Sequence, residues 1–367
     1  MRFPGFEGEW ERKQLSVCCE IYDGTHQTPK YTKTGIPFVS VEDITALRTI
    51  EKKFISEDDY KRDFKIAPQA GDILMTRIGD IGTSRVVTDN SPLAYYVSLA
   101  LLRPIGIEAS FLNSYIPSPY FKRELYRRTI HVAFPQKINK EDIGKCLFAH
   151  PSIVEQSKIG SFLSLLDQRI DTQSKLIEQY QSLIRALYRE MMPLNDVEVV
   201  SLGSLVKVSK GKQVNGDLLS DEGPFYVMNG GITPSGHFDE FNTPPETISI
   251  SEGGNSCGYV QFNENPFWSG GHCYTLLEPK TNVVHYKFLF HYLKSHQDDI
   301  MALRIGSGLP NIQKKDIESY PVLLPRFEKQ AQLAELFDGF CDIERIEFNF
   351  RDLLCKQKQF LLASVLT

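Results

Sequence analysis

The chain has 367 residues, of which 41% are hydrophobic and 24% are charged, and its formal net charge at pH 7 is −5. This composition excludes a largely disordered chain, and the length predicts about two to three domains that can each bury a core. No apolar run approaches the ~18 uninterrupted positions of a membrane span, and acidic residues interrupt the N-terminal stretch where a signal peptide would be apolar. The sequence therefore predicts a cytoplasmic protein.

The seven cysteines and eight histidines give no sign of a disulfide framework or a metal site. No Cys-x-x-Cys pair occurs, and Cys18 and Cys19 are too close in sequence to bridge without strain. His285, His291 and His296 have no cysteine or carboxylate pattern around them. We therefore expect no metal in this chain.

One sequence plan occurs twice. Residues that match at a constant offset of 187 are Glu11 and Glu198, Leu15 and Leu202, Ile21 and Val208, and Gly24 and Gly211. Further along, Leu-Leu-Arg-Pro at 101–104 corresponds to Leu-Leu-Glu-Pro at 276–279 at an offset of 175. Such self-similarity predicts two domains of the same fold.

In chain order, short strands are predicted at 37–41, 73–75, 85–87, 97–102, 247–251 and 274–277, and short helices at 118–129 and 286–295. Glycine-rich turns separate these elements. The pattern predicts an α+β protein with two pseudo-symmetric globular domains that contain mixed β-sheets. The predicted segments are a first domain at 1–150, a central helical segment at 151–195, a second domain at 196–324 and a C-terminal helical segment at 325–367.

Both helical segments carry apolar residues at the alternating spacing of three and four that is typical of coiled coils. In the first, these are Ile159, Leu163, Leu166, Ile170, Ile177, Tyr180, Ile184 and Leu187. In the second, they are Leu333, Leu336, Phe340, Ile343, Phe350, Leu354 and Leu361, interrupted by Glu347 and Gln357. A helix of this length extends roughly 55 Å. We expect the two to form an antiparallel coiled coil that separates the domains; the alternative is that each lies on a globular core.

A search for catalytic motifs finds none. A phosphate-binding Gly-x-x-x-x-Gly-Lys-Ser/Thr, a Gly-x-Gly-x-x-Gly and a Gly-x-Ser-x-Gly are all missing. Asn-Pro-Phe-Trp at 265–268 resembles the Asn-Pro-Pro-Tyr/Phe loop of amino-methyltransferases, but it lacks the second proline and a preceding glycine-rich cofactor loop. We therefore predict no catalytic residue and no cofactor in this chain.

The polar glycine-containing loops suit DNA recognition, because glycine lets the backbone approach closely while neighbouring polar side chains supply hydrogen bonds. In the first domain the candidate DNA-binding residues are Thr25, His26, Lys30, Tyr31, Thr76, Arg77, Ser84, Arg85, Gln136 and Lys137. In the second domain they are Lys210, Lys212, Gln213, Asn229, Asn255, Ser256, Arg304, Ser307 and Asn311. Because residues 196–324 carry 15 acidic and nine basic residues, any contact must use local patches.

The chain resembles the specificity (S) subunits of type I restriction-modification systems over essentially its full length. The first half is similar in Asp-Gly-Thr-His-Gln-Thr-Pro-Lys-Tyr at 23–31, Gly-Asp-Ile-Leu-Met-Thr-Arg-Ile-Gly at 71–79 and Gln-Lys-Ile-Asn-Lys-Glu-Asp-Ile at 136–143. The second half is similar in Ile-Ser-Ile-Ser-Glu-Gly-Gly at 248–254 and Leu-Pro-Asn-Ile-Gln-Lys-Lys-Asp-Ile at 309–317. The resemblance implies two target recognition domains, each reading one half of a bipartite, asymmetric sequence in double-stranded DNA.

The resemblance also implies partners. Two modification (M) subunits would supply S-adenosylmethionine and adenine methylation, and optional restriction (R) subunits would add ATP- and Mg-dependent translocation and cleavage. The chain itself would be non-catalytic and would bind no membrane. Two other hypotheses remain: an autonomous DNA methyltransferase or nuclease with an unrecognised site, and a coiled-coil adaptor that does not bind DNA.

Overall fold

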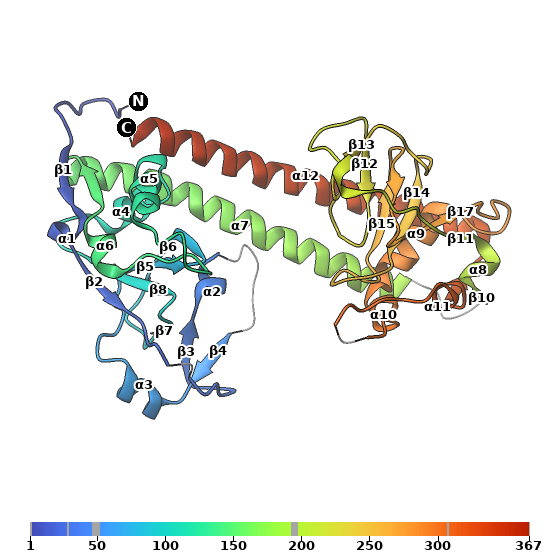
Figure 1. Ribbon diagram of the computed structural model, residues 1–367, viewed down its shortest axis with the longest axis horizontal. Helices are drawn as coiled ribbons and strands as arrows, with labels where there is room; N and C mark the ends of the chain where they lie inside the picture. Colours follow the sequence, from blue (N-terminus) through green and yellow to red (C-terminus); the bar gives the residue numbers. More distant parts are fainter. Residues whose placement is uncertain (1, 28, 46–51, 192–196, 307, 367) are drawn as a thin grey trace. The chain divides into compact units, whose positions relative to one another are not determined.

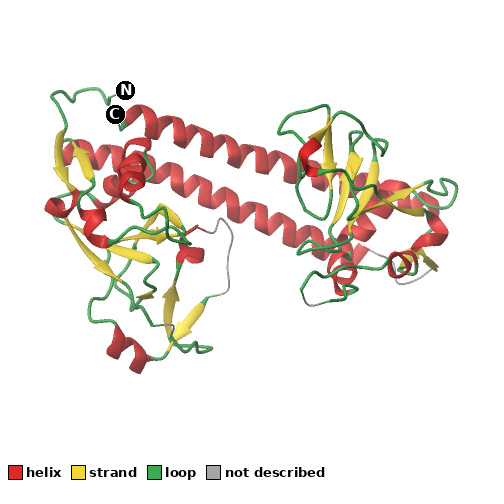
Figure 2. Cartoon of the chain, viewed as in Figure 1, coloured by secondary structure: helices red, strands yellow, loops and turns green. Residues whose placement is uncertain are grey.

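The computed structural model describes residues 2–27, 29–45, 52–191, 197–306 and 308–366. The chain divides into two compact units, one made of Met1–Glu178 with Ile346–Thr367 and the other of Gln179–Arg345. Both units combine helices with strands, as Figure 2 shows. The long helices α7 (Ile153–Met191) and α12 (Phe327–Val365) each contribute residues to both units.

The main sheet of the first unit has four antiparallel strands in the order β2 (Cys19–Asp23), β8 (Leu99–Pro104), β5 (Ile73–Ile78) and β6 (Asp80–Val86). A second sheet has the order β4 (Lys53–Ile55), β3 (Ile36–Val39) and β7 (Ala94–Tyr95), and β1 (Glu11–Gln14) pairs with β9 (Leu147–His150). The short helices are α1 (Leu15–Cys18), α2 (Val41–Thr45), α3 (Glu57–Asp63), α4 (Ala109–Tyr115), α5 (Pro119–Arg128) and α6 (Lys140–Gly144).

The second unit repeats this plan. Its four-stranded sheet has the order β11 (Lys207–Lys210), β17 (Cys273–Leu277), β14 (Thr247–Ser251) and β15 (Val260–Asn263). A three-stranded sheet contains β13 (His237–Phe238), β12 (Phe225–Met228) and β16 (Trp268–Ser269), and β10 (Glu198–Ser201) pairs with β18 (Pro321–Leu324). Its helical elements are α8 (Leu202–Leu205), η1 (Gly216–Leu218), α9 (Tyr286–Ser295), α10 (Gln297–Ala302) and α11 (Lys314–Glu318).

The predicted α+β fold with two repeated domains is confirmed, and Figure 1 shows the same kinds of element in each unit. Strand register corrects one detail of the repeat. Leu102 pairs with Ile21 and Ile73, whereas Leu276 pairs with Val208 and Ile248. Leu102 therefore corresponds to Leu276 at an offset of 174, one less than expected from the sequence. The residue types favour the offset of 175, which matches both leucines and the following proline. The strand register decides for 174, because a shift of one residue would place each side chain on the opposite face of the sheet.

The two long helices complete the hydrophobic core of each unit. In the first unit, Ile159 and Leu163 of α7 pack with Leu362 and Val365 of α12 in the same cluster as Phe111. In the second unit, Tyr188 of α7 and Leu333 and Phe337 of α12 pack with the cluster around Phe288 and Leu289. Each domain therefore depends on both helices for its buried apolar surface, so the helices are part of the domains and not separate spacers.

A buried glutamine joins a long helix to its domain in both units. The Oε1 atom of Gln156 accepts a hydrogen bond from the backbone N–H of Glu108, and its Nε2 donates to the carbonyl of Pro151. Gln330 does the same with the N–H of His285 and the carbonyl of Pro325. Both glutamines are about 1% exposed, as expected for buried amides whose hydrogen bonds are satisfied.

The helices pair in antiparallel orientation. In the first unit, Leu166, Ile170 and Leu354 form a cluster, flanked by an ion pair between Asp167 and Lys358 and a hydrogen bond between Gln173 and Glu347. In the second unit, Gln181 donates to Glu344 at 2.6 Å, and the ring of Tyr188 stacks on Phe337. In both units the partner number on α12 falls as the number on α7 rises, which confirms the predicted direction.

The predicted seam of α7 agrees with its burial, but three of the seven predicted seam positions of α12 are wrong. Ile159, Leu163, Leu166, Ile170 and Ile177 are buried, and Tyr180, Ile184 and Leu187 are half-buried. On α12, Leu333 and Leu354 are buried and Phe340 and Leu361 are half-buried, whereas Leu336, Ile343 and Phe350 are about 40% exposed.

The true second set of seam positions on α12 lies one residue later. It is occupied by Phe337, Glu344, Arg351, Lys358 and Val365, which are all buried or half-buried. Three of these side chains are charged, so a search for apolar residues at heptad spacing selects the wrong face. The helix pair instead accommodates these charges beside polar residues of α7, such as Gln181 for Glu344.

Candidate nucleic-acid interface

A cavity of about 450 Å³ opens in the second unit where the strands of the main sheet end. It is lined by Lys210, Gly230, Glu252, Gly253, Gly254, His272, Leu309, Pro310 and Asn311. Lys210 ends β11, Glu252 follows the last residue of β14, and His272 precedes β17. The ladder of β11, β17 and β14 therefore brings together three ionisable side chains that are far apart in sequence.

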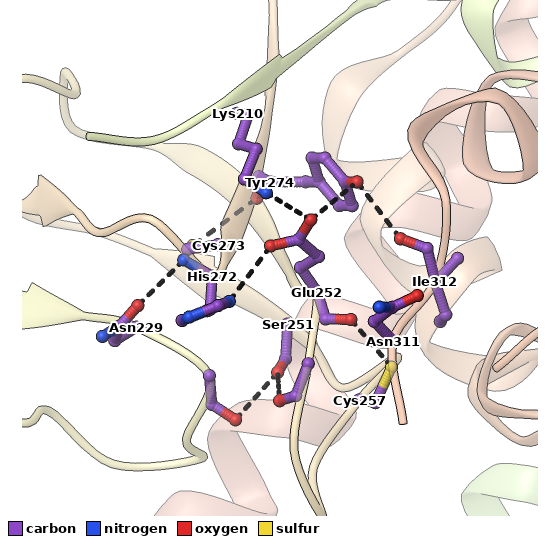
Figure 3. Close-up of polar contacts among 12 residues, drawn as sticks. Lys210, Asn229, Ser251, Glu252, Cys257, His272, Cys273, Tyr274, Asn311 and Ile312 are labelled. Atoms are coloured by element: carbon purple, nitrogen blue, oxygen red, sulfur yellow. Dashed lines mark hydrogen bonds and ion pairs between the residues drawn. The ribbon is translucent and has the colours of Figure 1, made fainter. Parts of the chain in front are cut away.

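Glu252 is the centre of this cluster, as Figure 3 shows. Its side chain is only 12% exposed, and Oε1 accepts an ion-paired hydrogen bond from the Lys210 ammonium. The Tyr274 hydroxyl also lies 3.3 Å from Oε1 and 3.1 Å from the carbonyl of Ile312. Nδ1 of His272 lies 3.3 Å from Oε2 and must be the donor there, because a carboxylate can only accept.

The surroundings hold this carboxylate in place. The backbone N–H of Glu252 donates to the carbonyl of His272 at 2.9 Å, and its carbonyl accepts from the N–H of Ile312 at 2.9 Å. Burial, and then the negative charge of Glu252, raises the pKa of Tyr274, so the tyrosine remains a neutral donor. The carboxylate is thus preorganised at the edge of the cavity.

Two of the predicted DNA-binding residues line this cavity, and a third bonds to one of its lining residues. Lys210 and Asn311 line it, and the Oδ1 atom of Asn229 accepts a hydrogen bond from the N–H of His272 at 2.9 Å. Sequence reasoning missed Glu252 and His272. The available signal was the position of Glu252 directly after a predicted strand and before two glycines, a place where a side chain reaches the edge of a sheet.

The other predicted residues of the second domain lie in loops. Lys212 and Gln213 follow β11, where the indole N–H of Trp268 donates to the carbonyl of Lys212 at 2.8 Å. Asn255 is exposed and Ser256 half-buried in the turn after Gly254, and the side chain of Arg304 is exposed. Ser307 lies outside the described residues.

In the first unit, the repeat places the opposite charges at the same positions. Asp23 corresponds to Lys210 and Arg77 to Glu252, and the Arg77 guanidinium lies 3.0 Å from the Asp23 carboxylate. The shared scaffold is visible in the backbone, because Ile138 N–H donates to the carbonyl of Arg77 just as Ile312 does to Glu252. The same structural position thus holds an ion pair of reversed polarity in the two domains.

Arg77 and Thr76, which are predicted to bind DNA, have internal partners in the structure. The Arg77 side chain is 7% exposed and donates to the carbonyls of Val97 at 2.8 Å and Ile138 at 3.1 Å. Thr76 is fully buried, and its hydroxyl contacts Asp80. Both side chains are buried and satisfy internal partners in this fold.

The remaining predicted residues of the first domain differ in their surroundings. His26, Lys30, Tyr31, Gln136 and Lys137 are exposed, and Thr25 is half-buried. Lys137 forms backbone bridges with Ile78 and Ile130 that match those of Asn311 with Gly253 and Ile305. Ser84 donates to the carbonyl of Asn113, and Arg85 contacts Asp171 of α7 at 3.2 Å, so both also have structural partners.

The described ranges contain no group of three or more histidine, cysteine, aspartate or glutamate residues that could hold a metal ion. Within the same ranges, no helix combines the length and apolarity that crossing a membrane requires.

A duplicated α+β domain with polar loops at the strand ends defines a repeated recognition module. The family model described as "Type I restriction modification DNA specificity domain" matches residues 7–181 and again 195–349, so the chain belongs to this family. These two matches coincide with the two copies of the repeat.

Individual proteins agree with this assignment. The chain is 35% identical over 141 residues to a protein of Mycoplasma pneumoniae named as a type I specificity subunit, a match that covers 38% of this chain and 37% of that protein. It is 24% identical to a protein of Methanocaldococcus jannaschii named as the specificity subunit of a type I restriction enzyme, over 98% of this chain and 93% of that one. The crystal structure of an S subunit from M. genitalium has a TM-score of 0.63 and 18% identity, and the match covers 100% of this chain and 99% of that chain.

Proposed function

We propose that this chain is the DNA sequence-recognition subunit of a type I restriction-modification complex and that each domain reads one half of a bipartite, asymmetric target. The observation that carries this proposal is that the DNA specificity domain model matches the chain twice, at 7–181 and at 195–349, on two domains of the same sheet order. Two domains with the same strand register but different loop side chains are what two unlike half-sites require. DNA contacts by exposed loop residues such as Lys137 and Arg304 belong to this proposal.

The same proposal makes the chain non-catalytic and dependent on partners in the cytoplasm. Two modification subunits would supply S-adenosylmethionine and adenine methylation, and optional restriction subunits would bring ATP and Mg. The exposed face of α12 supports a docked partner. Ile346, Phe350, Leu353 and Phe360 are between 41% and 63% exposed, and they repeat at spacings of four, three and seven residues on one face. Exposed apolar residues at such spacing are typical of an interface between helices.

Methylation mapping tests the recognition role. The full chain is expressed with its cognate modification subunit in a host without other adenine methylation, and methylated positions are mapped across the genome. We expect one bipartite motif, and exchange of residues 197–324 for those of another family member should change one half only. A change in both halves, or in neither, contradicts the modular proposal.

The docking role has a separate test. Leu353→Glu combined with Ile346→Glu should abolish co-purification with the modification subunit, because two carboxylates would be buried in an apolar interface. Leu218→Glu is the control, since Leu218 is about as exposed (60%) but lies on η1 in the second unit. Retained association of the double variant would contradict docking on this face.

Two alternatives give different outcomes. An autonomous methyltransferase or nuclease would act on DNA as purified protein with S-adenosylmethionine or Mg²⁺ and no other chain. A coiled-coil adaptor without a DNA role would associate with partners but leave the methylation pattern unchanged when residues 197–324 are exchanged.

A further inference from the structure

The cluster around Glu252 has unused hydrogen-bonding capacity that faces a cavity. An ionised carboxylate has about four acceptor positions, and an ammonium has three donors. Among the described residues, Oε1 of Glu252 receives Lys210 and shares the Tyr274 hydroxyl, whereas Oε2 receives only His272. One acceptor position on Oε2 therefore remains. Lys210 is 50% exposed and donates one proton to Glu252, so two donors remain on Nζ.

The free groups match one edge of a base pair. In the major groove, a G·C pair presents the adjacent acceptors N7 and O6 of guanine, followed by the N4 amino donor of cytosine. An A·T pair instead places its amino donor between two acceptors and adds a methyl group. Two neighbouring donors on one ammonium beside one carboxylate acceptor fit the first pattern. In the second pattern, the central amino group would separate the acceptors and the methyl group would face charged side chains.

The walls of the cavity allow such an approach. Gly230, Gly253 and Gly254 line it and carry no side chain that would hold a base edge away. The neighbouring His272 is 62% exposed and adds a ring nitrogen at the mouth. We infer that Lys210 and Glu252 read one G·C base pair of the second half-site, with Lys210 on guanine and Glu252 on cytosine. This inference rests on the proposed DNA recognition by the second domain.

A purely structural role is the competing explanation, because Asp23 and Arg77 hold the equivalent position in the first unit. The exposure of the two pairs differs. The Arg77 side chain is 7% exposed and two carbonyls satisfy it, whereas half of the Lys210 side chain is exposed at a cavity. The first unit also shows that the scaffold accepts the reversed polarity. A variant in which Lys210 and Glu252 exchange their charges should therefore still fold but recognise a different base pair.

The experiment uses the full chain with its cognate modification subunit and genome-wide methylation mapping. The double variant Lys210→Asp with Glu252→Arg rebuilds the ion pair of the first unit in the second. We expect an unchanged first half-site, and loss or replacement of one G·C pair in the second half-site. An unchanged motif, or a second half-site without any G·C pair in the wild type, would overturn the inference.

A conservative variant covers the case in which the double variant does not fold. Glu252→Gln keeps the size of the side chain, and we expect methylation to relax at one position, with discrimination reduced about tenfold. The matched control is Lys207→Met with Glu278→Gln, because this pair (2.7 Å) also joins β11 to the end of β17 but is exposed on both sides. The control should leave the motif unchanged.

The outcomes distinguish the two proposals. A wild-type complex that produces no bipartite methylation motif contradicts the proposed function itself. A wild-type bipartite motif that neither Glu252→Gln nor the charge exchange alters contradicts the base-pair assignment alone.

Discussion

The ring of Tyr188 stacks face to face on Phe337, with ring centroids 3.6 Å apart and an interplanar angle of 5°. Tyr188 lies near the end of α7 and Phe337 near the start of α12, and both belong to the core cluster of the second unit. Burial raises the pKa of Tyr188, so its ring stays neutral in this stack. The stack therefore connects both long helices to one domain core.

Phe337→Ala should destabilise the protein by about 3–5 kcal/mol, because it leaves a cavity beside Tyr188. The neighbouring Leu336→Ala is the matched control, since Leu336 is 39% exposed and its truncation should change the free energy of unfolding by about 0.5 kcal/mol or less. Urea unfolding monitored by circular dichroism measures both. Equal effects of the two variants would contradict the observed helix register.

Arg77→Met should destabilise the first unit by about 3–5 kcal/mol, because Asp23 and two carbonyls would lose a buried partner. A side chain that served only as a phosphate contact would instead leave the unfolding free energy unchanged and reduce the salt dependence of DNA binding. The measurements are urea unfolding and DNA affinity at several salt concentrations. Wild-type stability in this variant would show that Arg77 is not a structural residue.

Arg304→Ala should leave stability unchanged and weaken DNA binding by the assembled complex similarly for all sequences. Its side chain is exposed, and loss of one phosphate contact lowers the slope of log affinity against log salt by about one. Lys207→Ala is the control, because Lys207 pairs with Glu278 on the surface of the same domain. If both variants keep the wild-type slope, Arg304 does not contact phosphate.

Lys294 should make stability depend on pH in the alkaline range. Burial lowers the pKa of Lys294 to about 8 in the folded protein. The unfolded chain, with a pKa of about 10.4, therefore holds more protons at this position between the two values, and stability rises with pH there. Relative to Lys294→Met, the unfolding free energy of the wild type should increase by roughly 1–2 kcal/mol between about pH 8 and pH 9.5.

The comparison with Lys294→Met removes the contribution of tyrosines, which titrate in both proteins. Urea unfolding at matched pH values measures the difference. Parallel stability curves for the two proteins would show that Lys294 is not held at a lowered pKa.

Element types and the repeat were readable from the sequence because they depend on local periodicity. The strands predicted at 73–75 and 247–251 lie in β5 and β14, and the helices predicted at 118–129 and 286–295 are α5 and α9. The seam of α7 was predictable for the same reason, since apolar residues occupy nearly all of its positions. The seam of α12 was not, because the charged residues Glu344, Arg351 and Lys358 are half-buried there. Glu344 and Lys358 contact Gln181 and Asp167 of α7.

The candidate site was predictable only in part. Lys210 and Asn229 were found because polar residues beside glycines favour binding loops, but the contact of Lys210 with Glu252 depends on the pairing of β11, β17 and β14. Arg77 was assigned to the DNA surface because its sequence context resembles that of a loop residue. Its carboxylate partner lies on another strand, and no local pattern indicates it.

The sequence by itself determined the duplication, the α+β class, the two long helices and the family to which the chain belongs, because each depends on residues that are close in sequence or repeated along it. The tertiary structure alone decided which face of α12 is buried, which ion pairs are buried or exposed to solvent, and which loop residues line the same cavity. These properties depend on contacts between segments far apart in the chain, where one residue of register moves a side chain from the core to the solvent.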